Sequence, residues 1–193
     1  MKNNNHTKRL ILAALFAALC MVSTAFLAFP LPTGYANPGD GFAFVSGFVL
    51  GMPWGIAAAG LGSALADLVL GYAVYMPATA ILKALIAVAG AVCARILLRK
   101  AGKYPLWAVL LCSLSGEAVM VLGYFVYECL VIGVGEAAVI SIPANVGQGA
   151  VGILVSAALV SALFKIPGLR KLTAGIREEK NAEENGNGET GGK

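Results

Sequence analysis

The sequence predicts an all-α, polytopic membrane protein: a six-transmembrane-helix bundle whose second helix is short. Of its 193 residues, 59% are hydrophobic and only 12% are charged, whereas an ordinary soluble domain carries roughly 25% charged residues. The apolar residues form long blocks, as membrane helices require, because ~20 apolar residues must satisfy their backbone hydrogen bonds inside lipid. With a mean hydropathy of +0.80, the chain has too few charges to cover a water-soluble surface.

Proline and glycine divide the first half of the chain into three helices. The first helix is expected at residues 9–29, where two prolines end it. A loop rich in Pro, Gly and Asn follows at 30–39, then a short helix at 42–52 and a third helix at 54–70. Residues 23–25 resemble a signal-peptide cleavage site, but the apolar run continues past them and more spans follow. We therefore expect the first helix to be retained.

The second half of the chain contains three longer apolar blocks. A turn at 71–78 precedes the first of them, and a basic connector at 99–103 follows it. The predicted helices cover residues 79–98, 106–132 and 139–164. After residue 172 the chain becomes polar and rich in Gly, Asn and Glu, a composition typical of disorder. The sequence thus predicts a membrane domain at 1–172 and a disordered cytoplasmic tail at 173–193.

The positions of Lys and Arg predict the topology. They cluster at residues 2–9, 95–103 and 165–171, and the loops between these clusters on the opposite side contain none. With six spans all three clusters lie on one side, which the positive-inside rule makes cytoplasmic, so both termini are expected in the cytoplasm. One alternative keeps this parity: segments 42–52 and 54–70 could form a re-entrant hairpin, which would leave four spans.

The residue types also exclude several classes of function. The cations lie at the ends of apolar blocks, not on an interleaved basic patch, so no nucleic-acid partner is expected. The four cysteines lie in apolar blocks without C-x-x-C spacing, which predicts neither a metal site nor a disulfide. The single histidine, His6, precedes the first apolar block, so no catalytic cluster, metal or cofactor is expected and the chain is not predicted to be an enzyme.

Hydrophilic residues inside the predicted spans gather in the outer half of the bilayer. Lys83 is the only one of the 14 basic residues within a span and not at its cytoplasmic end, and a charge at mid-membrane costs at least ~2.5 kcal/mol. It lies only ~6 Å below the outer end of its helix at the helical rise. These positions predict a cavity open to the outside. Its expected binding residues are Tyr35, Asn37, Asp40, Asp67, Tyr75, Lys83, Tyr124, Glu128, Asn145 and Gln148.

The spacing of these residues supports convergence but leaves alternatives open. Glu117, Tyr124 and Glu128 follow one another at i, i+7 and i+11, which places them on one side of a helix. In the alternative, Lys83 extends its amine to the interface and the polar residues of the last two helices only bridge neighbouring helices. For Glu117, the deepest, neither reading is favoured. The outer loop at 33–40 could be a lid over the cavity or a plain connector.

The first helix carries a separate signal. Ala13, Ala14, Ala17 and Ala18 form two overlapping A-x-x-x-A pairs, and small residues at this spacing let another helix approach closely. The sequence does not decide whether that partner is a helix of this chain or of another protein.

An ordered series of short motifs resembles a known family. The series runs through Pro30-Leu31-Pro32, Asn37-Pro38-Gly39-Asp40, Leu50-Gly51-Met52-Pro53-Trp54-Gly55, Gly62-Ser63-Ala64-Leu65-Ala66-Asp67-Leu68, Gly71-Tyr72, Pro77 and Lys83. It resembles the substrate-binding S component of energy-coupling-factor (ECF) vitamin transporters, in the riboflavin-type group that also includes carriers for pyridoxine-like and hydroxymethylpyrimidine substrates. The likeness extends from about residue 8 to 172 and is densest from 30 to 83.

The resemblance implies a six-helix subunit in the cell membrane of a prokaryote that captures a small heterocyclic vitamin from outside. It also implies docking through the alanine pairs onto a coupling transmembrane subunit driven by two ATPase subunits. This chain has no G-x-x-x-x-G-K-[ST] loop, so ATP hydrolysis is expected only from such partners. Tyr35, Tyr72, Tyr75 and Tyr124 would suit a flat heterocycle. The alternative function is a stand-alone secondary transporter of a small solute, with Glu117 as the candidate group near mid-depth.

Overall fold

The computed structural model describes residues 2–31, 34–99 and 106–165. Within these ranges, six α-helices, a short hairpin and two short helical turns follow in the order α1 (Lys2–Phe26), β1 (Phe29–Leu31), β2 (Gly34–Ala36), α2 (Gly39–Leu50), α3 (Trp54–Val69), α4 (Met76–Arg99), α5 (Leu106–Tyr127), the π-helix η1 (Glu128–Ile132), the 3-10 helix η2 (Gly135–Ser141) and α6 (Ile142–Lys165). The predicted all-α membrane bundle is confirmed. The predicted tail at 173–193 lies outside the described residues.

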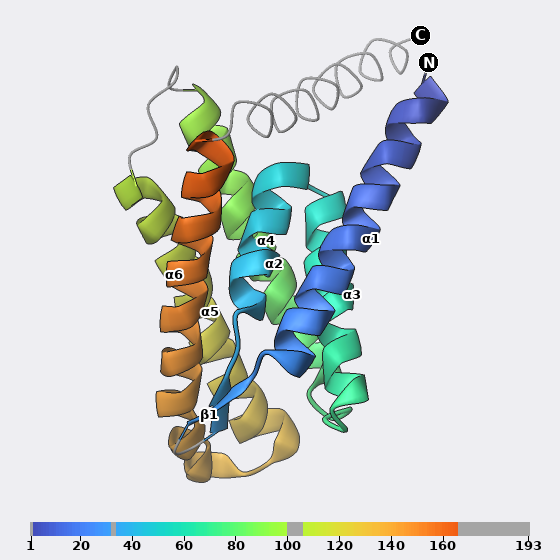
Figure 1. The fold of residues 1–193 in the computed structure, drawn as a ribbon. Coiled ribbons are helices and arrows are strands. Elements are labelled where there is room, and N and C mark those ends of the chain that lie inside the picture. The colour runs from blue at the N-terminus through green and yellow to red at the C-terminus, as the bar shows by residue number, and fades with distance from the viewer. Residues whose placement is uncertain (1, 32–33, 100–105, 166–193) are drawn as a thin grey trace, which may run out of the picture.

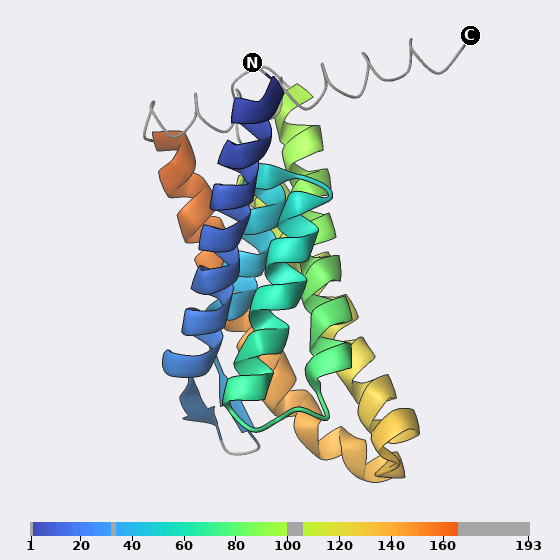
Figure 2. The same ribbon diagram turned by 90° about the vertical axis from the view of Figure 1, so that its right-hand side faces the viewer.

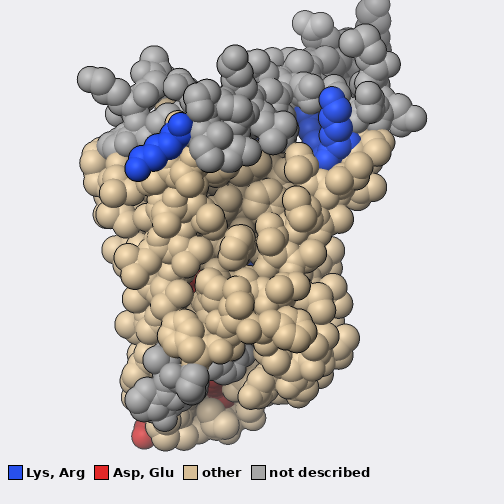
Figure 3. Space-filling model, in the orientation of Figure 1, with Lys and Arg blue, Asp and Glu red and all other residues tan. Residues whose placement is uncertain are grey.

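The helices run between two ends of an elongated bundle (Figures 1 and 2). One end carries the β1–β2 hairpin, η1 and η2, and we call it the hairpin end. The other carries the start of α1 and the end of α6, and we call it the terminal end. The Lys and Arg side chains visible in Figure 3 gather at the terminal end. On this face, the described cations therefore lie at one end of the bundle.

Four of the described helical segments are long and apolar enough to cross a membrane, and α2 and α3 are shorter. Their large exposed apolar side chains, such as Ile11, Leu122 and Leu154 at 62–68% exposure, fit a surface in contact with lipid. The short second helix was predicted. Its 12 residues make α2 only ~18 Å long at the helical rise.

Helix α2 forms the centre of the bundle. Eleven of its twelve residues are buried, and it contacts α1, α3, α4 and α6. Glycines permit this central packing: a Cβ at Gly47 would collide with the backbone of Ala87, and a Cβ at Gly90 would collide with the backbone of Phe44. Because both glycines lie on the α2–α4 contact, these two helices touch backbone to backbone. The helix ends at Gly51, whose positive φ of 67° suits glycine.

The ends of the elements differ from the sequence prediction at the hairpin end. The predicted loop at 30–39 contains the antiparallel pair β1–β2, in which Phe29 lies opposite Ala36 and Leu31 opposite Gly34. Proline fixes an extended φ that a short strand outside a larger sheet tolerates. The predicted helix at 106–132 changes to a π-helix at Glu128, and the sixth helix is preceded by η2 and not simply by a loop. Hydrophobic periodicity does not report such changes of helix type.

Candidate functional site

A cavity of about 270 Å³ opens between the helices at the hairpin end. Helix α2 begins part-way along the bundle (Figure 1), so its missing turns leave space that the surrounding longer helices enclose. The cavity is lined by Thr24, Asn37, Asp67, Tyr72, Tyr75, Thr79, Lys83, Tyr124, Glu128, Ser141, Ala144, Asn145 and Gln148. These residues come from α1, the segment before α2, α3, the α3–α4 turn, α4, α5, η1, η2 and α6. The short central helix is thus the structural cause of the cavity.

A chain of hydrogen bonds and one ion pair joins four buried side chains where the cavity meets α2. Asn37 Nδ2 donates to Gln148 Oε1 at 3.1 Å, and Gln148 Nε2 donates to Asp40 Oδ2 at 2.8 Å. Lys83 Nζ lies 2.5 Å from Asp40 Oδ1. Asp40 is fully buried and Lys83 is 2% exposed, so both charges depend on this pairing. We call Asn37, Gln148, Asp40 and Lys83 the buried network.

Local backbone structure explains why the buried network forms at this place. Asp40 lies in the first turn of α2, where the partial positive charge of the helix N-terminus favours an anion. The backbone N–H of Gly39 donates to Asn37 Oδ1 at 2.9 Å, which satisfies one of the free donors at the helix start. Lys83 Nζ also lies 5.6 Å from the centre of the Tyr124 ring, a cation–π contact. The network therefore connects α2, α4 and α6, and the cation–π contact adds α5.

A second polar cluster surrounds Glu128 in η1. Tyr75 donates its hydroxyl to Glu128 Oε1 at 3.4 Å, and Ser141 donates to Glu128 Oε2 at 2.5 Å. Burial and the Glu128 carboxylate raise the pKa of the Tyr75 phenol above its usual range, so Tyr75 remains a donor at neutral pH. Thr79 Oγ1 lies 2.7 Å from the hydroxyl of Tyr124. Several of these tyrosines therefore have fixed positions around the cavity.

The family model for the ECF-type riboflavin transporter S component matches residues 4–165. The chain belongs to this family. The match extends over all six described helices, so it covers the cavity and the buried network together. No curated protein matches the chain. Membership establishes an S component of the transport class, and vitamin uptake across a membrane is its general role.

The S component places eight of the ten predicted binding residues on the cavity wall, where they meet from separate helices. They are Asn37, Asp67, Tyr75, Lys83, Tyr124, Glu128, Asn145 and Gln148. Asp40 lies behind the wall, paired with Lys83. The backbone of Tyr35 lies in β2 opposite Pro30, and its side chain is outside the described part of the structure.

The alternative in which Lys83 extends its amine to the interface does not occur, because the amine turns inward to Asp40. Glu117 does not line the cavity. It is 3% exposed and packs against Gly149 and Gly152, beside Asp40. In the S component Glu117 thus lies between helices α5, α6 and α2, as the helix-bridging alternative proposed.

Four wall residues of this S component were absent from the sequence prediction: Thr24, Thr79, Ser141 and Ala144. These residues carry no charge that would mark their depth, and small side chains such as Ser, Thr and Ala are common in membrane helices. Thr24 lies in what is otherwise an apolar run, and its hydroxyl oxygen is buried without a hydrogen-bond partner among the described residues. A search for hydroxyl residues at the depth of Lys83 would have found Thr79, one helical turn away.

Three polar groups at the cavity wall have no hydrogen-bond partner in the described part of the S component. Two of them are the buried atoms Thr24 Oγ1 and Asp67 Oδ2. The third is the side-chain amide of Asn145, for which no hydrogen bond to a described residue is found. Asn145 is half-buried and lies one helical turn from Gln148, which is fully engaged in the buried network. Groups of this kind are available to bind a ligand without breaking a bond within the protein.

The four alanines of α1 divide between two surfaces. Ala13 is buried, and the backbone of Ala17 packs against Gly62 of α3 so closely that a Cβ on that glycine would collide with it. Ala14 and Ala18 are exposed. The stripe therefore serves two contacts: one pair closes the bundle of the S component, and the other pair remains on its surface.

Proposed function

We propose that this S component captures a small heterocyclic vitamin from outside the cell in the cavity at the hairpin end. The observation that carries the proposal is the set of free polar groups beside tyrosine rings in one cavity. Ligand sites combine such apolar and aromatic walls with a few convergent polar groups. A volume of about 270 Å³ lies just below the ~300–1,000 Å³ usual for ligand sites, which favours a compact one- or two-ring compound over a flavin.

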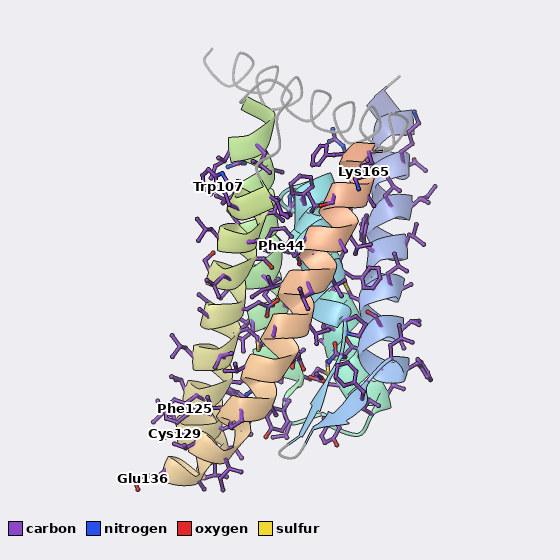
Figure 4. The ribbon with its side chains drawn as sticks, turned by 60° about the vertical axis from the view of Figure 1, so that its left-hand side comes forward. Phe44, Trp107, Phe125, Cys129, Glu136 and Lys165 are labelled. Carbon is purple, nitrogen blue, oxygen red and sulfur yellow. The ribbon has the colours of Figure 1, made fainter. Side chains whose placement is uncertain are left out.

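The orientation of the cavity follows from charge. The described chain begins and ends at the terminal end, where Lys165 (Figure 4) and the other visible cations lie, and the acidic Glu136 marks the hairpin end. By the positive-inside rule the terminal end faces the cytoplasm, so the cavity opens to the outside of a prokaryotic cell membrane. Capture from the medium requires this arrangement.

Asn145 provides the cleanest test of the proposed site. Changing Asn145 to Ala is expected to weaken vitamin binding by about tenfold, the loss of a hydrogen bond of ~1.4 kcal/mol. Because the amide has no partner among the described residues, the melting temperature in detergent should stay unchanged. Isothermal titration with the vitamin found in a thermal-shift screen measures the affinity.

Ser115→Ala is the control for this experiment, since Ser115 is exposed and donates only to the carbonyl of Cys112 in its own helix. Its affinity should equal that of the wild type. Equal affinities in all three proteins would remove Asn145 from the site. A chain that binds no vitamin at all would contradict the proposed function itself.

We further propose that the exposed pair Ala14 and Ala18 docks the S component onto a coupling transmembrane subunit, which two ATPase subunits drive. Residues four apart lie on one face of a helix, and small side chains let a partner helix approach closely. The pair belongs to the membrane-spanning part of α1, within the candidate span His6–Phe26. Ala13 and Ala17 are excluded from this surface by their contacts within the bundle.

Enlarging the exposed alanines should separate capture from coupling. Ala14→Phe and Ala18→Phe are expected to leave vitamin affinity unchanged and to lower the yield of coupling subunit that co-purifies by about tenfold, as overpacking of ~1–3 kcal/mol implies. The matched control is Ala150→Phe, an exposed alanine on α6. Equal co-purification in all variants would place the docking surface elsewhere.

A further inference from the structure

We propose that the cargo of this cavity carries a positive charge: it is a compact heteroaromatic cation, or a heterocycle bearing a protonated amine. This inference rests on the proposed function and narrows its substrate class. It follows from the charges, the free polar atoms and the aromatic rings on the cavity wall. Neither a neutral flavin nor a phosphate ester has this chemistry.

The wall carries more negative than positive charge. Its ionisable side chains among the described lining residues, tyrosines aside, are Lys83, Asp67 and Glu128. The single positive charge is already neutralised, because Lys83 Nζ lies 2.5 Å from Asp40 Oδ1. The carboxyl groups of Asp67 and Glu128 therefore remain on the wall without an ion pair among the described residues.

Asp67 is the acidic wall residue that most clearly lacks a hydrogen-bond donor. It is 4% exposed, its Oδ2 has no hydrogen-bond partner among the described residues, and it lines the cavity. The side chain of Thr79 and the charge of Lys83 already act on this carboxyl group, so Oδ2 is the one atom left open, and a buried polar atom without a partner is costly. A protonated nitrogen on the cargo would supply both the charge and the hydrogen bond.

Glu128 also lacks a compensating charge. It is 8% exposed, and its two described side-chain partners, the hydroxyls of Tyr75 and Ser141, are uncharged donors. The cavity thus presents carboxylates from α3 and from η1, two separate elements of the wall. A cation bound between these elements would be attracted by both.

The tyrosines complete a setting suited to cations. Tyr75 lies at the middle of a group of rings, with ring-centre distances of 6.5 Å to Tyr72 and 6.3 Å to Tyr124, and all three line the cavity. Aromatic faces attract cations within about 6 Å, and several rings around a carboxylate form the usual cage for organic ammonium groups. The same faces can stack on a flat heterocyclic ring.

A panel of probes that share a ring but differ in charge tests the inference. Pyridoxamine carries a protonated amine, pyridoxine is neutral and pyridoxine phosphate is anionic, all on one pyridine ring. Thiamin (cationic), riboflavin (neutral) and riboflavin phosphate (anionic) extend the comparison to other rings. We expect the tightest binder, by thermal shift and titration of the full chain in detergent, to be a cation. A neutral or anionic tightest binder would overturn the inference and leave the proposed capture function standing. Binding of none would contradict both.

Variants test the two carboxylates directly. Asp67→Asn and Glu128→Gln keep the shape of each side chain and remove its charge. Each variant should lower the affinity for the best cationic probe by about tenfold or more. The affinity for the neutral probe of the same series should change far less. Glu136→Gln is the matched control, because Glu136 is an exposed acid at the tip of the same end (Figure 4) and does not line the cavity. Unchanged cation affinity in both variants would overturn the inference.

Discussion

Replacing Lys83 by methionine is expected to destabilise the folded protein by about 3–5 kcal/mol, because it leaves the carboxylate of Asp40 buried without its cation. Both members of the pair are almost fully buried, at 2% and 0% side-chain exposure, so water cannot replace the lost partner. The measurement is the urea or thermal unfolding midpoint in detergent, followed by tryptophan fluorescence. Vitamin binding should be lost at the same time, since Gln148 and Asn37 are positioned through Asp40.

A double variant tests whether the loss of stability comes from the unpaired charge of Asp40. The double variant Lys83→Met with Asp40→Asn removes both charges, so it should recover most of the stability that the single variant loses. Lys165→Met is the control, because this lysine is exposed at the terminal end of α6. A single Lys83→Met variant as stable as the wild type would show that the ion pair does not hold the bundle together.

Adding one methyl group at Gly47 is expected to be the second most damaging change. The Cβ of Gly47→Ala would collide with the backbone of Ala87, which cannot rotate away as a side chain could. Helices α2 and α4 must therefore separate, and overpacking of a tight core costs ~1–3 kcal/mol or more. The unfolding midpoint in detergent measures this loss.

The matched control makes the same substitution at a glycine with more room. A Cβ at Gly116 of α5 would lie 3.3 Å from the Cβ of Ala89, a tight contact with a side chain and not a collision with backbone. Gly116→Ala should change the midpoint much less than Gly47→Ala. Similar midpoints for the two variants would mean that α2 and α4 are not held in backbone contact.

The bundle could be predicted from the sequence because lipid imposes simple requirements on it. Backbone hydrogen bonding inside lipid requires helices, so each long apolar block predicts one. The prolines after the first block predict the end of α1, because proline cannot continue a helix. The short apolar block that follows predicts the short helix α2. Lys83 could also be singled out, since a charge within a span requires a partner. The sequence could not identify that partner, because Asp40 and Lys83 are distant along the chain and meet only through the packing of α2 on α4.

The remaining differences arise from packing between helices. Spacing alone identifies two overlapping alanine pairs on α1 but does not say which pair is buried. Only the contact with Gly62 of α3 assigns Ala17 to the interior. Glu117 follows the same helical stripe as Tyr124, yet it lies behind the cavity wall against the glycines of α6. Periodicity defines a face of a helix, and the neighbouring helices decide what covers each part of that face.

The central helix has a consequence for how a solute could cross the bilayer. Beyond the ion pair, the core toward the terminal end is filled by side chains that are 0–1% exposed, including Phe44, Phe48, Ile86 and Leu97. This apolar plug leaves no water-filled path for an ion or a vitamin through the described part of the chain. Liposomes that contain this polypeptide alone should therefore bind the vitamin at one membrane surface and remain impermeable to it. Release on the other side would require partner subunits that separate the helices around the plug.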